Sequence, residues 1–162
     1  MILLLLLGCA SQLISYSQSS GTFVSTMNVE PVMELSLTNS ASNIVFSTSG
    51  QYAAEYVVTN FNTVSIKSNQ NWNVSLAATS SFFTASGSFS SSNMPASLCK
   101  IGVTGQSNTL SLSTSAQLLS TGNRGDEDAA GNTFDVTLKV NPGYNYGAGT
   151  YSLGIVYTLT AK

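Results

Sequence analysis

The sequence has no histidine and few charges: its 162 residues include five Lys and Arg against seven Asp and Glu, for a net charge of −2. Without histidine, the usual proton shuttle near neutral pH is missing and no Ser/His/Asp nucleophile can be assembled. We therefore expect no enzyme activity. The lack of a basic cluster also argues against binding to nucleic acid, whose phosphates require one.

Cysteine is scarce too, because the sequence holds only Cys9 and Cys99. A short apolar run followed by small residues near the N-terminus predicts a secretion signal at residues 1–17, cleaved before Gln18. Two alternatives stay open: Cys9 is lipidated, or the segment is retained. Removal would leave Cys99 as a lone buried thiol without a disulfide framework. We expect a mature protein that is secreted or at the cell surface, with no transmembrane span.

Alternation of apolar and polar residues dominates the rest of the sequence. Successive side chains of a strand point to opposite faces of a sheet, so this pattern predicts half-buried strands. It is clear around Trp72, the expected core anchor, which shares a face with Val74, Leu76 and Ala78. The expected strands include residues 32–38, 44–46, 51–58, 63–67, 71–78, 132–141 and 151–159.

Many short strands without a helical period indicate an all-β fold. We expect an immunoglobulin-like or pilin-like antiparallel β-sandwich of about eight or nine strands over residues 32–162. An N-terminal amphipathic strand extension at residues 18–31 should precede it. A closed barrel is the structural alternative.

The N-terminal extension has an apolar row of its own. Phe23, Met27 and Val29 fall on one side of an extended chain, and Pro31 suits an edge, a bend or a switch between sheets. Two interpretations fit residues 22–30. They can act as a donor strand that completes the open sheet edge of another copy, or they can fold back as the first strand of their own sandwich.

One loop gathers carboxylates. Asp126, Asp128 and Asn132 surround glycines in "STGNRGDEDAAGNTFD", and oxygen ligands of this kind suit calcium. The bidentate glutamate expected later in a calcium loop is missing. A solvated hairpin whose charges discourage aggregation is therefore the alternative to a metal site. We expect no other cofactor.

Two tyrosines stand in a glycine-rich segment before the last expected strand. Tyr144 and Tyr146 in "NPGYNYGAGTY" could stack on sugar rings or pack against a neighbouring subunit. The alternative is a turn whose tyrosines cover the end of the sandwich.

Two segments resemble known families. "KSNQNWNVSLAA" and "NPGYNYGAGTYSLGIVYTLTA" are similar to secreted bacterial β-sandwich domains of the pilin and spore-coat-U type, and to WxL-type surface domains. The resemblance implies a secreted, non-catalytic surface protein that assembles. Our first hypothesis is a structural subunit of an extracellular bacterial filament or surface layer, a homopolymer joined through its N-terminal strand. The alternative is a monomeric secreted or cell-surface binding module, with carbohydrate as a candidate ligand.

Overall fold

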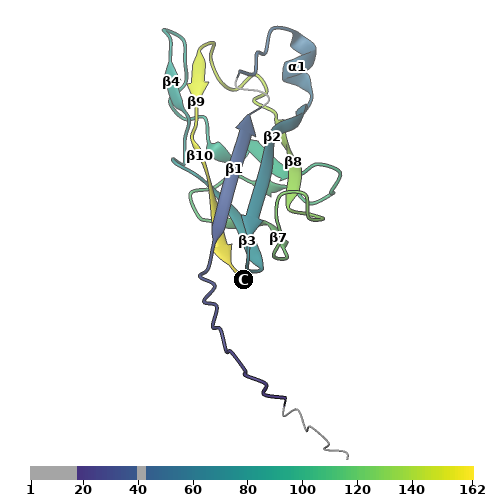
Figure 1. Ribbon diagram of the computed structural model, residues 1–162. Helices are drawn as coiled ribbons and strands as arrows, with labels where there is room; N and C mark the ends of the chain where they lie inside the picture. The colour runs from purple at the N-terminus through teal and green to yellow at the C-terminus, as the bar shows by residue number, and fades with distance from the viewer. Residues whose placement is uncertain (1–17, 40–42) are drawn as a thin grey trace, which may run out of the picture.

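Two antiparallel β-sheets face each other in the computed structural model, which describes residues 18–39 and 43–162 (Figure 1). The larger sheet has five strands in the order β1 (Met33–Asn39), β2 (Tyr56–Ser68), β8 (Thr133–Val140), β5 (Cys99–Val103), β6 (Leu110–Ser111). The smaller sheet has three, in the order β10 (Ile155–Ala161), β3 (Trp72–Ala78), β7 (Gln117–Gly122). The all-β expectation is confirmed. The predicted signal at residues 1–17, with Cys9, lies outside the described residues.

A single apolar core fills the space between the two sheets. Trp72 is fully buried on β3, as its alternating row predicts, and packs with Ile66 and Val64 of β2. The row of β8 is likewise buried at Val136, Leu138 and Val140. Because β1 and β10 are the outer strands of separate sheets, the described strands form open sheets and no closed barrel.

The long strand β2 connects the two ends of the domain. The sequence predicts two short strands here, but the structure has one strand of 13 residues. Its pairing with β8 shifts register between Val58 and Asn62, and Asn60 within this bulge has a φ of 56°. A bulge bends a strand without ending it. Two separate alternating segments thus belong to a single element.

Other expectations near the N-terminal half are wrong in part. Residues 44–46 form no strand, and the first half of 51–58 forms the short helix α1 (Ser49–Ala53). Gln51 explains the helix, because its side-chain oxygen accepts the backbone N–H groups of Ser47 and Thr48 at 2.8 and 3.1 Å. Capping of this kind favours the start of a helix in a segment whose apolar alternation suggests a strand.

The C-terminal segment also divides. The sequence predicts one strand at 151–159, whereas the structure has β9 (Thr150–Ser152) and β10, separated at Leu153 and Gly154. β9 is not part of the smaller sheet and pairs instead with β4 (Thr84–Ser86) in the serine-rich loop. A 3₁₀ turn (Ala96–Leu98) ends this loop. The pair stands at the same end of the domain as α1 (Figure 1).

Candidate functional site

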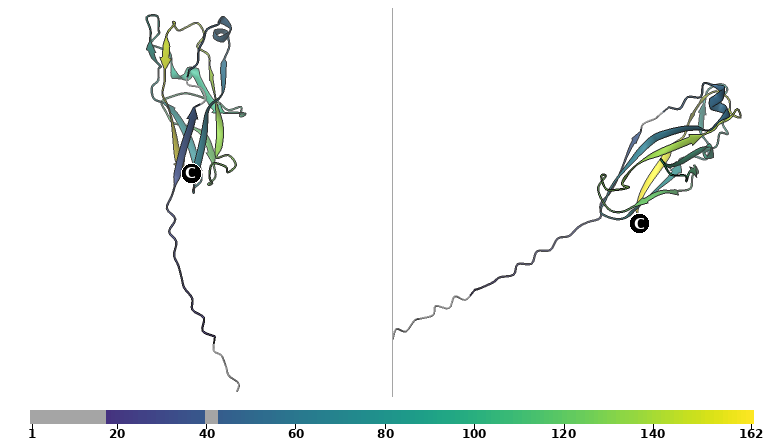
Figure 2. Two further views of the ribbon diagram at one scale, coloured as in Figure 1. Left: turned by 45° about the horizontal axis from the view of Figure 1, so that its top comes forward. Right: turned by 90° about the vertical axis from the view of Figure 1, so that its right-hand side faces the viewer.

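Residues 18–32, here called the arm, extend away from the domain. They contain no helix or strand, and every one of them is exposed. Figure 2 shows the arm leaving the end of the domain where the C-terminus also lies. The structure therefore does not place residues 22–30 as a first strand of their own sandwich.

The apolar row of the arm faces solvent. Phe23, Met27 and Val29 are 90%, 87% and 69% exposed. Large apolar side chains seldom stand together in water without a partner, and such exposure marks interaction sites. The predicted assembly residues thus lie on one extended segment that is free to meet another surface.

The arm is held where it enters β1. The side-chain amide of Asn69 donates to the carbonyl oxygen of Glu30 at 2.7 Å, and its Oδ1 accepts the backbone N–H of Val32 at 2.9 Å. The backbone N–H of Asn69 also donates to the carbonyl of Val32 at 3.1 Å. These contacts fix the base of the arm beside the turn between β2 and β3.

An apolar groove of about 660 Å³ opens at the other end of the domain, a size typical of binding pockets. Its lining comes from the segment 147–155, which contains β9, from residues 43–46 and from the end of β8. Phe61, Met94 and Cys99 also line it. Its remaining lining side chains are Tyr52, Phe83, Pro142 and Tyr146.

The two predicted tyrosines have different surroundings. Tyr146 lines the groove. Tyr144 is 70% exposed, stacks on Tyr52 of α1 with ring centroids 5.4 Å apart, and donates its hydroxyl to the carbonyl of Ser49 at 3.1 Å. The ring centroids of Tyr52 and Phe46 are in turn 5.6 Å apart. The sequence analysis missed this aromatic group, although aromatic residues at 46, 52 and 56 were a visible signal.

The carboxylate loop is anchored to the core through Asn132, while its carboxylates Asp126, Glu127 and Asp128 are exposed. Asn132 is buried, and its Oδ1 accepts the indole N–H of Trp72 at 3.2 Å while its amide donates to the carbonyl of Asp126 at 2.8 Å. In residues 18–39 and 43–162, no cluster of three or more His, Cys, Asp or Glu could hold a metal ion. The calcium site at Asp126, Asp128 and Asn132 stays a prediction, and Asn132 Oδ1 already accepts the indole N–H of Trp72.

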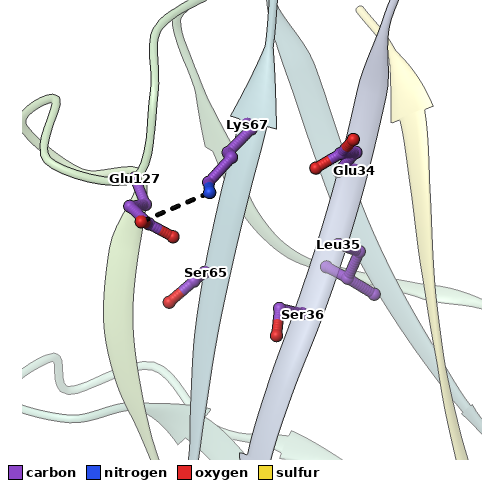
Figure 3. A pocket seen from close by; sticks show the side chains of 6 residues that line it. All are labelled: Glu34, Leu35, Ser36, Ser65, Lys67 and Glu127. Carbon is purple, nitrogen blue, oxygen red and sulfur yellow. Dashed lines mark ion pairs between the residues drawn. The ribbon is translucent and has the colours of Figure 1, made fainter.

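A second, polar hollow lies on the outer face of the larger sheet (Figure 3). Lys67 and Glu127 form an ion pair across it at 3.3 Å, with both side chains about half exposed. Glu34, Leu35, Ser36 and Ser65 complete its lining. Exposed ion pairs add little to stability, so we assign this hollow no function.

Burial raises the pKa of two groups in the described part of the chain. Burial raises the pKa of the Cys99 thiol to about 11, which leaves it uncharged and unreactive near neutral pH. Burial likewise raises the pKa of Tyr157 to about 12. The Tyr157 hydroxyl donates to Asn62 Oδ1 at 3.1 Å and so links β10 to β2.

Comparisons with known proteins identify no family, so the function is inferred from the geometry of the structure. No helix in the described part of the chain is both long and apolar enough to cross a bilayer. No family model matches the sequence, and no curated protein matches it.

Proposed function

We propose that this protein is a structural subunit of an extracellular filament or surface layer, and that it assembles by placing its N-terminal arm on another copy. The observation that carries the proposal is the solvent-exposed row of Phe23, Met27 and Val29 on an arm without intramolecular strand partners. Burying each large apolar side chain contributes about 1.5–3 kcal/mol. Three of them together contribute about 4.5–9 kcal/mol toward the cost of association between copies.

The domain offers matching open edges. β1 and β10 are the outer strands of their sheets, so each has backbone groups that no described strand pairs. An open edge is a template for a strand from another chain, with backbone hydrogen bonds for affinity and side-chain contacts for specificity. An immunoglobulin-like or pilin-like sandwich built this way agrees with the resemblance in the sequence, and the predicted signal at 1–17 supports secretion.

Negative-stain electron microscopy and sedimentation across a concentration series test the proposal. The wild-type chain should form regular polymers. A Phe23→Ser/Met27→Ser/Val29→Ser variant should remain monomeric, because its arm has lost the apolar row. The matched control is Val24→Ser, which removes an equally exposed apolar residue from the opposite face of the arm. The control should polymerise like wild type. Uniform wild-type monomers at every concentration would refute self-assembly.

A monomeric binding module is the second candidate function. The observation in its favour is the apolar groove, which Tyr146 lines beside the exposed Tyr52–Tyr144 stack. Aromatic rings of this kind bind sugar faces. This function requires that the wild-type chain bind a glycan while monomeric, and that Tyr144→Ala/Tyr146→Ala abolish binding without changing the thermal unfolding midpoint.

A further inference from the structure

We propose that the apolar groove beside β9 is the acceptor for Phe23, Met27 and Val29 of a second copy. This inference rests on the proposed assembly through the arm and names the surface that receives it. The alternatives are insertion of the arm into its own groove, and pairing with an edge away from the groove.

The arm and the groove match in chemistry. The residues that line the groove include no charged side chain, and residues 18–29 of the arm also carry none. Inserting the arm therefore moves no charged side chain out of water. Burial of an unpaired charge would oppose binding strongly. Exposed apolar side chains near the groove, Val45 at 59% among them, would be covered by the same event.

The arm and the groove lie at opposite ends of β2. Met33, which follows the arm, pairs with Ser68 at the last residue of β2, whereas Val140 of the groove pairs with Tyr56 at the first. At about 3.3 Å per residue, the 13 residues of β2 span about 40 Å. The views of Figure 2 agree, with the arm at one end and β9 at the other.

This separation prevents the arm from filling its own groove. The groove residue of β2 nearest to the arm is Phe61, seven residues or about 23 Å from Ser68. Glu30 is held at Asn69, and a fully extended chain reaches only about 10 Å from Glu30 to Met27. Met27 and Val29 therefore cannot enter it while this contact holds, so the occupant must be another copy.

The groove also has free backbone along its rim. Among the described strands, β9 pairs only with β4 and β10 only with β3. Across the groove, no backbone hydrogen bond joins residues 43–46 to any described strand. An extended arm from another copy can thus hydrogen-bond along the edge of β9 that β4 leaves free, while its apolar row enters the groove.

Site-specific cross-linking tests this assignment in a Cys9→Ser/Cys99→Ser background, which must first polymerise like wild type because Cys99 lines the groove. A tagged donor with Met27→Cys is mixed with a differently tagged acceptor carrying Val45→Cys at the groove rim. The control acceptor carries Leu118→Cys, which is similarly exposed at 56% but lies on β7 and does not line the groove. We expect a disulfide-linked heterodimer with the Val45→Cys acceptor, at least tenfold more than with the Leu118→Cys acceptor.

The outcomes separate this inference from the proposed function. Polymers whose arms cross-link equally to both acceptors, or mainly to Leu118→Cys, would overturn the groove assignment and leave assembly standing. If the wild type does not polymerise, the proposed assembly is refuted. Binding of a fluorescent peptide of residues 18–32 to the full chain then tests whether the groove accepts the arm. Binding that Val45→Asp reduces at least tenfold, while the exposed control Val57→Asp does not, supports the groove. Absence of binding overturns it.

Discussion

Single residues join the loops of this protein to its core. The buried Trp72 indole donates to the carbonyl of Asn123 at 3.0 Å as well as to Asn132, which holds the carboxylate loop in place. Charge is scarce in the sequence, with five Lys and Arg against seven Asp and Glu. Here hydrogen bonds between neutral groups fix the loop to the core.

Asn132→Ala should destabilise the domain by about 1–3 kcal/mol, the usual result of leaving buried partners unpaired. Chemical denaturation followed by Trp72 fluorescence measures the change. Asn108→Ala, at an exposed loop position, is the matched control and should leave the free energy of unfolding unchanged. An unchanged free energy of unfolding in the Asn132→Ala variant would show that the hydrogen bond between Asn132 and Trp72 does not contribute to stability.

Tyr157 should make the protein sensitive to alkali. Its pKa is about 12 in the folded state because of burial, against about 10 when unfolded, so the folded state favours the neutral phenol. Its contribution is complete below pH 10 and is lost as the pH rises toward 12. Between pH 8 and pH 11 the free energy of unfolding should fall in both proteins. The fall should be about 1 kcal/mol smaller in Tyr157→Phe than in wild type. Parallel losses in the two proteins would contradict this.

At the scale of elements, the base of the arm depends on one side chain. Asn69→Ala removes the two side-chain hydrogen bonds to Glu30 and Val32 but touches no core residue. We expect faster proteolytic cleavage near Pro31 with a thermal unfolding midpoint close to wild type. The exposed Asn145→Ala variant serves as the comparison. Equal cleavage rates in all three proteins would mean that the strand pairing of β1 alone orders this junction.

Alternation predicted the strands that present a regular apolar row to the buried core. β3 and β8 were correctly predicted because each presents a strict apolar row to the core. Alternation could not tell a capped turn from a strand, so α1 was missed. It also could not say which chain the row of Phe23 would pack against, since the same pattern suits a strand of the fold and a strand for a neighbour.

The groove could not be predicted from the sequence. Its walls come from residues 43–46, the end of β8 and the 147–155 segment, which tertiary packing alone brings together. The tyrosine segment was singled out from the sequence, but its contact with Tyr52, about ninety residues earlier in the sequence, could not be predicted. Local patterns carry no information about such distant partners.

At the scale of the whole molecule, the proposed assembly joins an arm at one end to a groove at the other. Contacts of this kind do not close, and they build chains of indefinite length. A subunit with a defective arm and an intact groove should end a growing chain. One Phe23→Ser/Met27→Ser/Val29→Ser copy per ten wild-type copies should limit polymers to on the order of ten subunits. Electron microscopy of mixed samples measures the lengths. Unchanged lengths would show that the groove of this variant does not accept a wild-type arm.

The direct passage of the arm into β1 has a mechanical consequence. β1 is paired with β2 along all seven of its residues, and the hydrogen bonds of an antiparallel ladder lie perpendicular to the strands. Tension on the arm along the axis of β1 therefore pulls that ladder in shear, and its bonds must break together, not one after another. The N-terminus is thus a strong point of attachment, at which a pulling force is shared by the whole strand.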